Sequence, residues 1–238
     1  MVKVFPDSAA ASQASADFFL KTAQEAIQRK GRFTVALTGG SSPVQLYKLL
    51  AQPPYREEVP WGNTFVFWGD ERVVPHDDDR YNAKMAFETL LSHVPVPKGQ
   101  IYPMSGELPP DESARQYEAL LKKHFANQPP RFDLILLGMG DDGHTASLFP
   151  HTPVLGEQTR WVSELFLASQ NMYRITLTAP LINQAEKILF QVFGGNKAST
   201  LQTVLHGAYQ PEQYPSQLIK PAEGEPYWYV DEAAAGQR

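Results

Sequence analysis

The sequence contains no cysteine, which excludes disulfide bonds, thiolate-ligated zinc and thiol catalysis. It also lacks long apolar runs: a stretch such as Leu134 to Leu137 is far too short to cross a bilayer. No continuous apolar stretch opens the chain, because Asp7 and Asp17 interrupt it. We therefore expect no signal peptide and a cytoplasmic location.

An excess of positive charge is also missing. The chain carries 21 Lys and Arg against 26 Asp and Glu, a formal net charge of −5, and its basic residues are scattered. Nucleic acid and anionic membranes need a basic face, so neither is expected as the main partner. A small anionic substrate remains compatible with this charge, because a few local cations are enough to bind it. The sequence indicates no obligate protein partner.

The composition that is present is typical of a folded globular protein, with 42% hydrophobic and 20% charged residues. A compact chain of this size buries roughly 70% of the surface that it exposes when unfolded. There is no internal repeat, and the proline-rich stretches at 53–60, 95–110 and 129–130 resemble surface connections more than linkers. We predict one domain over residues 1–238.

Hydrophobic periodicity predicts an alternation of helices and strands. Helices are expected at 8–30, 43–50, 82–91, 111–125 and 197–205, and strands at 33–38, 64–68, 132–137, 173–178, 188–193 and 228–230. Ser8 is the expected N-cap of the first helix, Gly31 and Gly207 the expected helix stops, and Pro43 the first residue of the second helix. This alternation is typical of an α/β sandwich with a largely parallel sheet.

Ligands of open parallel sheets collect at the carboxyl ends of the strands, where this chain has several polar, glycine-rich loops. The first includes Gly39, Gly40, Ser41 and Ser42. Its glycines let the backbone approach a ligand closely, and Ser42 begins a helix whose free N–H groups favour an anion. The alternative interpretation is a tight turn, and the spacing matches neither the dinucleotide fingerprint nor the P-loop.

Two further loops carry cations. Asp70, Glu71 and Arg72 follow a strand, where the guanidinium fork suits phosphate oxygens and a neighbouring acid would orient it; the alternative is an exposed cluster of ion pairs. In the loop at 194–197, Asn196 is a reasonable N-cap that places Lys197 in the first turn of a helix. A bound anion would make that lysine favourable there, and otherwise it points into water.

The stretch from Gly138 to Thr145 is the strongest candidate for chemistry, because three glycines, two acids and a histidine follow a very apolar strand. A histidine shuttles protons near neutral pH, and a carboxylate can fix its tautomer. We therefore predict His144 as the reactive residue, with one of the two neighbouring acids, Asp141 or Asp142, as its partner.

No metal site is predicted. The run from His76 to Asp79 lacks EF-hand spacing and is interpreted as a solvated acidic loop, and neither His144 nor His151 has a partner at zinc-helix spacing. Ser41 and Ser147 lie outside any nucleophile-elbow motif. The remaining histidines are interpreted as structural: His93, His124 and His206.

Five ordered blocks resemble the 6-phosphogluconolactonase family over nearly the whole chain. They are LTGGSSP at 37–43, WGDERVVP at 68–75, DLILLGMGDDGHTASLFP at 133–150, RITLTAPLINQAEKILF at 174–190 and GGNKA at 194–198. Glucosamine-6-phosphate deaminases share the Asp-Gly-His core, but their histidine is typically followed by an Ile-Ala-Phe-Asn-Glu type sequence. Here the residues that follow are Thr-Ala-Ser-Leu-Phe-Pro, the lactonase form.

The resemblance implies a three-layer α/β/α sandwich that hydrolyses 6-phospho-D-glucono-1,5-lactone to 6-phospho-D-gluconate in the oxidative pentose phosphate pathway, without metal or cofactor. It implies that His144 is the general base, and that Asp142 and Asp70 orient or tune the site. Of the two acids beside the histidine we therefore prefer Asp142 as its partner, and interpret Asp141 as a solvated neighbour. The residues that it implies for phosphate binding are Gly39, Gly40, Ser41, Arg72 and Lys197.

Three points stay open at this stage. The chain has Asp-Arg-Tyr-Asn at 79–82 where the family usually has an Asp-Ser-Asn-Tyr type sequence, which leaves the role of Arg80 undetermined. An amino-sugar phosphate deaminase is the nearest alternative enzyme. A catalytically silent sugar-phosphate sensor is the alternative from another class.

Overall fold

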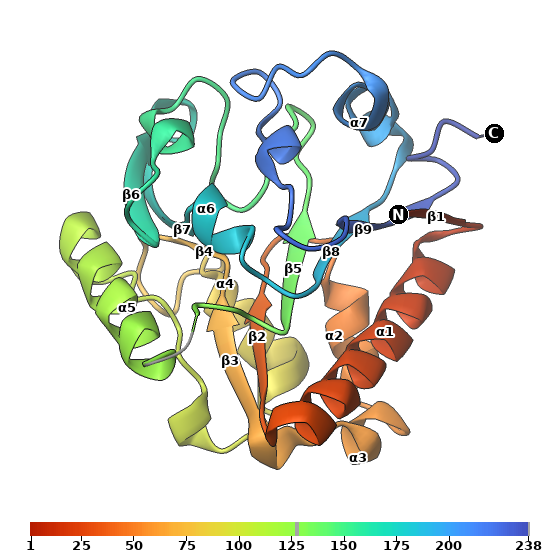
Figure 1. Cartoon of the computed structure of the whole chain (residues 1–238), viewed down its shortest axis with the longest axis vertical. Helices are drawn as coiled ribbons and strands as arrows, with labels where there is room; N and C mark the ends of the chain where they lie inside the picture. The colour runs from red at the N-terminus through yellow and green to blue at the C-terminus, as the bar shows by residue number, and fades with distance from the viewer. Residues whose placement is uncertain (127–128, 238) are drawn as a thin grey trace.

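The computed structural model describes residues 1–126 and 129–237, and its centre is a six-stranded sheet in which every neighbouring pair is parallel. The strand order is β1-β9-β8-β5-β2-β3 (Figure 1). Its strands are β1 (Val2–Phe5), β2 (Phe33–Leu37), β3 (Thr64–Trp68), β5 (Leu134–Gly138), β8 (Ile188–Val192) and β9 (Tyr227–Asp231). A second, antiparallel sheet consists of β4 (Asp70–Arg72), β7 (Met172–Leu177) and β6 (Val162–Leu167), in that spatial order.

Successive side chains of the central strands point to opposite faces of the sheet and pack into two hydrophobic cores, one on each face. In β5, Leu134 and Leu136 belong to one core, whereas Ile135 and Leu137 belong to the other. Because both faces are buried, the strand consists almost entirely of apolar residues. This explains why its sequence shows no alternation of polar and apolar residues.

Helices cover both faces, which confirms the predicted three-layer α/β/α sandwich. On one face lie α1 (Ser8–Lys30), α2 (Val44–Leu50), α3 (Tyr55–Glu58) and α4 (Asn82–Ala86). The other face carries α5 (Pro110–His124), α6 (Ala179–Ile182), α7 (Ala198–His206) and the antiparallel sheet. In Figure 1, α5 stands on the opposite side of the sheet from α1 and α2.

The ends of the first helix differ in part from the prediction. Asp7, not Ser8, is the N-cap, since its side chain accepts a hydrogen bond from the Ala10 N–H at 2.8 Å. A carboxylate at this position also faces the positive end of the helix dipole. At the other end Gly31 has φ of 72°, in the left-handed region that commonly ends an α-helix, so the predicted boundary is confirmed.

Other elements form with shifted bounds or a different partner. Pro43 stands at the N-cap of α2 instead of its first residue, and the helix expected at 82–91 changes at Phe87 into a π-helical turn that ends at Leu91. The strand expected at 173–178 forms as β7 but joins the antiparallel sheet. The short or partly polar elements β1, α3, α6 and β6 lie outside the predicted elements, because none shows a clear period.

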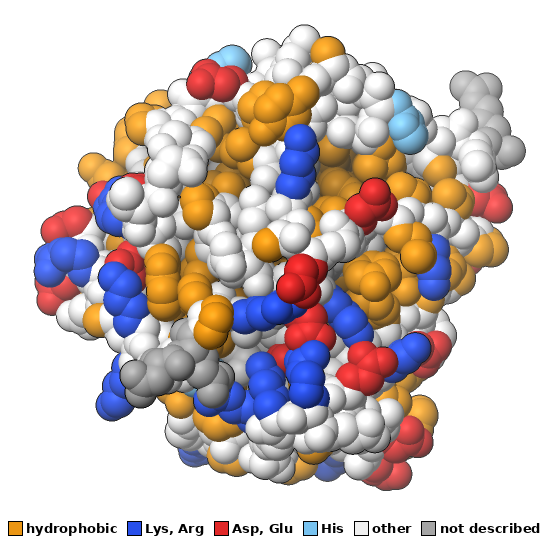
Figure 2. Space-filling view, in the orientation of Figure 1, with side chains coloured by type: hydrophobic (Ala, Val, Ile, Leu, Met, Phe, Trp, Pro, Cys, Tyr) orange, Lys and Arg blue, Asp and Glu red, His pale blue; other side chains and the backbone are white. Residues whose placement is uncertain are grey.

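Within residues 1–126 and 129–237, no helix combines the length and apolar character needed to cross a membrane. On the face in Figure 2, a group of Lys and Arg side chains near the lower centre has Asp and Glu side chains beside it. Ion pairs such as Arg29–Glu186 and Arg131–Glu223 also bring opposite charges together on the molecule. Positive charge on this face is therefore not gathered into one unbroken basic surface.

His124, at the end of α5, packs into an aromatic core. Its ring lies 4.9 Å from the Phe67 ring, and its Nε2 lies 3.2 Å from Thr34 Oγ1. Burial, together with the charges of Arg32 and Lys30, lowers the pKa of His124 to about 4. The folded protein therefore holds this imidazole neutral at pH values where an unfolded chain protonates it.

We predict that His124 makes folding sensitive to acid. The unfolded imidazole binds its proton near pH 6.5 and the folded one near pH 4, so its contribution to stability is lost as the pH falls through this window. The slope reaches at most about 1.4 kcal/mol per pH unit. Urea unfolding of the wild type and of His124→Gln between pH 4 and 7 measures this effect. As the pH falls, the free energy of unfolding should decrease more steeply for the wild type than for the variant. Parallel curves would contradict the assignment.

Candidate active site

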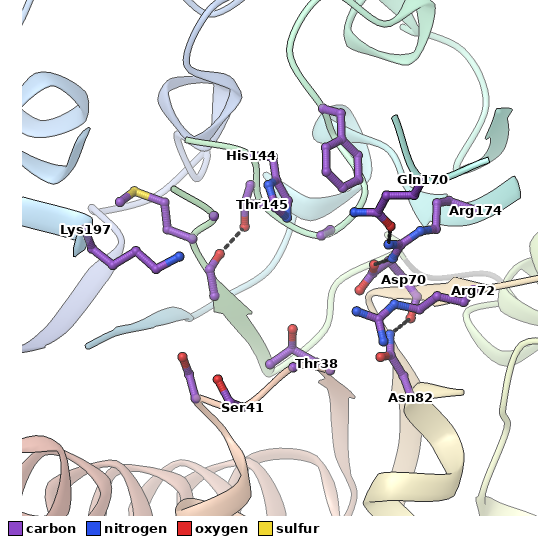
Figure 3. A pocket seen from close by; sticks show the side chains of 18 residues that line it. Thr38, Ser41, Asp70, Arg72, Asn82, His144, Thr145, Gln170, Arg174 and Lys197 are labelled. Atoms are coloured by element: carbon purple, nitrogen blue, oxygen red, sulfur yellow. Dashed lines mark hydrogen bonds and ion pairs between the residues drawn. The ribbon is translucent and has the colours of Figure 1, made fainter. Parts of the chain in front are cut away.

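The predicted loops meet in one cavity of about 230 Å³ at the carboxyl ends of β2, β5 and β8 (Figure 3). Neighbouring parallel strands end at the same edge of the sheet, so loops that are far apart in the sequence become neighbours. Residues predicted for the site that line this cavity are Gly39, Gly40, Ser41, Asp70, Arg72, His144 and Lys197. Asp142 stands behind His144, outside the lining.

His144 and Asp142 form a close pair. Asp142 Oδ1 lies 2.6 Å from His144 Nδ1 and also accepts a hydrogen bond from the His144 backbone N–H at 3.1 Å. Burial alone would raise the pKa of Asp142, but the hydrogen bond and charge of His144 outweigh it and lower the pKa. An ionised Asp142 only accepts, so Nδ1 carries the proton and Nε2 is left free to accept one.

The glycines around His144 give its ring room. A side chain at Gly140 would overlap the imidazole of His144, and Gly143 has φ of 79°, in the left-handed region. Hydrogen bonds from Gly140 N to His144 O at 2.8 Å and from Gly143 N to Gly140 O at 3.0 Å hold the loop closed. The ring stacks on Phe149 with centroids 4.0 Å apart. Gly140 is therefore a packing requirement of the histidine, whereas Gly143 is required by the backbone conformation of the loop.

The first glycine loop lies at the bottom of the view in Figure 3, where Thr38 and Ser41 are labelled. Gly40 has φ of 82°, and a side chain at Gly39 would overlap the carboxamide of Asn82. Asn82 is buried; its Nδ2 donates to Asp70 O at 3.0 Å, and its Oδ1 has no hydrogen-bond partner among the described residues. Sequence reasoning did not single out Asn82.

The segment from Asp70 to Arg72 is a strand, not the loop expected from the sequence. As β4 it pairs with β7, and Arg72 stands directly opposite Arg174. Among the described residues, neither neighbouring acid contacts the Arg72 guanidinium directly, so the direct orientation that the sequence suggested is wrong. The Glu71 carboxyl group accepts backbone N–H groups instead, and Arg72 Nη1 donates to Arg80 O at 2.8 Å.

Glu71 is fully buried beneath this strand. Its carboxyl oxygens accept hydrogen bonds from the backbone N–H groups of Arg72 at 2.8 Å, Asn82 at 2.7 Å and Ala83 at 2.9 Å. Burial raises the pKa of Glu71 to about 8, and the three hydrogen bonds limit this rise. This carboxyl group therefore acts on the main chain and does not line the cavity.

Arg174 is a cavity residue that sequence reasoning missed, although it begins the fourth block of the family resemblance. It is 4% exposed; its guanidinium donates to Gln170 Oε1 and lies 3.9 Å from Asp70 Oδ2. Burial lowers the pKa of Arg174 to about 10, the Asp70 charge raises it, and the Arg72 charge lowers it. A lone cation within an otherwise apolar strand was the available signal.

Asp70 does not contact His144 in the manner of Asp142. Its Oδ2 accepts a hydrogen bond from Ser147 Oγ at 2.7 Å and faces Arg174. As the first residue of β4, Asp70 therefore links the antiparallel sheet to the histidine loop through Ser147. Figure 3 shows Asp70 beside Arg174.

Lys197 enters the cavity from the side opposite Arg72 and Arg174 (Figure 3). Asp141 is not a solvated neighbour, because it forms an ion pair with Lys197 and accepts a hydrogen bond from Asn196 Nδ2 at 2.9 Å. Asn196 is therefore not the N-cap that we expected: residues 195–197 form a 3-10 turn, and α7 begins at Ala198.

Arg80, whose role the resemblance left open, keeps its side chain outside the cavity. The guanidinium pairs with Asp78 at 2.6 Å and is 59% exposed. Only its carbonyl oxygen takes part, as the acceptor for Arg72. Across residues 1–126 and 129–237, no group of three or more His, Asp or Glu side chains is arranged to hold a metal ion.

Comparison with known proteins shows which family the chain resembles. Residues 6–228 match the family model described as glucosamine-6-phosphate isomerases/6-phosphogluconolactonase. A protein of Synechocystis sp. named 6-phosphogluconolactonase is 42% identical over 214 residues, covering 88% of this chain and 86% of its own.

Solved structures share the fold. The crystal structure of a devB protein has a TM-score of 0.90 at 32% identity and covers 99% of both chains. A monomeric glucosamine-6-phosphate deaminase has a TM-score of 0.84 at 20% identity over 100% of this chain and 99% of its own, which shows a common fold alone. On the family model and the 42% identical relative, the chain belongs to the 6-phosphogluconolactonase family of hydrolases.

Proposed function

We propose that the chain hydrolyses 6-phospho-D-glucono-1,5-lactone to 6-phospho-D-gluconate, with His144 as the general base. The observation that carries the proposal is the pair of His144 and Asp142 at a cavity that also receives Arg72, Arg174 and Lys197. A proton acceptor and a group of cations in one cavity suit a neutral reacting centre with a remote anionic group. The activity named for the 42% identical relative supports the same reaction.

The chemistry needs one base and one water. Nε2 of His144 takes a proton from water as its oxygen attacks the lactone carbonyl carbon, while Asp142 stabilises the imidazolium that forms. The resulting tetrahedral intermediate expels the ring oxygen, which takes the proton back from His144 and leaves as a hydroxyl group. The product is an open-chain acid, and His144 returns to its neutral form.

The phosphate group would bind between the cationic walls. We assign Gly39, Gly40, Ser41, Arg72 and Lys197 to this role, and add Arg174 because its buried guanidinium lines the same cavity. Binding a remote phosphate contributes to the rate by holding the carbonyl at the base. Asp70 would act by holding Arg174 and Ser147 in place. We also propose that residues 1–238 form one lactonase domain; its cytoplasmic location stays a prediction.

We predict that His144→Ala lowers kcat by about 10²–10⁴-fold, the usual contribution of a general base. Affinity for 6-phosphogluconate should persist, because the phosphate contacts are untouched. Asp142→Asn should also lower kcat, since an amide cannot stabilise the imidazolium. Initial rates on freshly made lactone, corrected for its spontaneous hydrolysis, measure both effects, with calorimetry for product binding. Turnover like that of the wild type in His144→Ala would remove this residue as the base.

We predict that Arg72→Ala and Lys197→Ala each raise KM by roughly 10- to 100-fold with little change in kcat, as expected for losing a charge-assisted hydrogen bond to phosphate. Unphosphorylated glucono-1,5-lactone should show no such effect. Arg115→Ala is the matched control, because this arginine lies on an exposed helix face with Asp111. An unchanged KM in both cavity variants would contradict the assignment of the phosphate contacts.

The same assays separate the alternatives. Ammonia release from glucosamine 6-phosphate would identify a deaminase. Binding of 6-phosphogluconate without any acceleration of lactone decay would identify a silent sensor. Acceleration of lactone hydrolysis by the wild type is the result expected from the proposal.

A further inference from the structure

We propose that Glu71 is a positioning residue for this reaction: its buried carboxyl group joins the two ends of the loop at 72–82 and thereby sets where the Arg72 guanidinium stands in the cavity. The inference rests on the proposed function, because it concerns how the phosphate contact of Arg72 is built. Glu71 itself does not line the cavity.

The hydrogen bonds of Glu71 close this loop at its base. The loop leaves β4 at Arg72 and returns to α4 at Asn82. One oxygen, Oε1, accepts the N–H groups of both Arg72 and Asn82, at 2.8 and 2.7 Å, while Oε2 accepts the N–H of Ala83 at 2.9 Å. One side chain thus bridges the first and last residues of the loop, beside the hydrogen bond from Asn82 Nδ2 to Asp70 O at 3.0 Å.

Arg72 depends on that closure for its own position. Its Nη1 donates to the carbonyl oxygen of Arg80 at 2.8 Å, and Arg80 lies just before the end of the loop that Glu71 holds. The Nε of Arg72 is buried without a hydrogen-bond partner among the described residues, so the Arg80 carbonyl is the guanidinium's observed protein acceptor. Moving the end of the loop therefore moves the acceptor that orients the guanidinium.

The body of the loop has other anchors. The hydroxyl of Tyr81 donates to Met104 O at 2.6 Å, and the Asp78 carboxylate pairs with Arg80. Because these contacts do not involve Glu71, we expect them to keep the loop folded when Glu71 is changed. The expected consequence of a Glu71 substitution is therefore a misplaced Arg72 within a folded protein.

A double-mutant cycle tests the proposal. Glu71→Gln keeps one acceptor oxygen but presents an N–H₂ group to the donors, and it should raise KM for the phosphorylated lactone by about tenfold, as for a weakened charge-assisted contact. The value of kcat and the turnover of unphosphorylated glucono-1,5-lactone should stay near those of the wild type. Combined with Arg72→Ala, the Glu71 substitution should add nothing further, because it acts through Arg72.

Glu118→Gln is the matched control. Glu118 also accepts two backbone N–H groups, from Trp161 at 2.8 Å and Val162 at 3.2 Å, but it lies on α5 away from the cavity. Its substitution should lower the melting temperature without changing KM. An effect of Glu118→Gln on KM equal to that of Glu71→Gln would reduce Glu71 to a general stabilising role and overturn the proposal.

The outcomes also separate this inference from the proposed function. If the wild type fails to accelerate lactone hydrolysis, the proposed function fails. If the wild type is active and Arg72→Ala raises KM, but Glu71→Gln leaves KM unchanged or multiplies the Arg72→Ala effect, the positioning role fails. Should Glu71→Gln not fold, Glu71→Asp takes its place in the same cycle with the same criteria, because the shorter carboxylate cannot reach both ends of the loop equally.

Discussion

The parallel pairing of β2 with β3 and β5, and of β5 with β8, is the constraint on which the rest of this molecule depends. It brings the ends of four strands to one edge of the sheet. The glycine loop after β2, the histidine loop after β5 and the lysine turn after β8 then share one cavity. Each loop is locally unremarkable in length. Their side chains can act together because the pairing of the strands places the three loops next to one another.

The antiparallel sheet adds the wall that the parallel sheet cannot supply. Pairing of β4 with β7 sets Arg72 opposite Arg174, two like charges that repel when nothing else is near. The Asp70 carboxylate and the side-chain oxygen Oε1 of Gln170 compensate for the charge of Arg174, and the backbone carbonyl oxygen of Arg80 does so for Arg72. Such a concentration of positive charge is costly in an empty cavity and becomes favourable when an anion enters.

The sequence allowed prediction of those parts of the site whose signal is local. The glycines beside His144 indicate a loop in which a bulky ring has little room. The apolar run before them predicts a strand that is buried on both faces. The pairing of Asp141 with Lys197 has no local signal, because it depends on β5 and β8 becoming neighbours. The cation within β7 was visible in the sequence, but its place in the cavity depends on the pairing of β7 with β4. Glu71 illustrates the same limit: an acid next to an arginine suggests an ion pair, whereas burial turned its carboxyl group toward the main chain.

The hydrogen bonds of Ser147 tie the two halves of the site into one body. Its Oγ donates to Asp70 at 2.7 Å and its N–H donates to Thr176 Oγ1 at 3.2 Å, so the histidine loop is fastened to the antiparallel sheet that carries Arg174. The span from proton acceptor to cationic wall is then set by the protein and not by whatever enters. In the proposed reaction this fixed distance selects substrates by length. A phosphorylated lactone of another chain length would place either its phosphate at the cations or its carbonyl at His144, but not both.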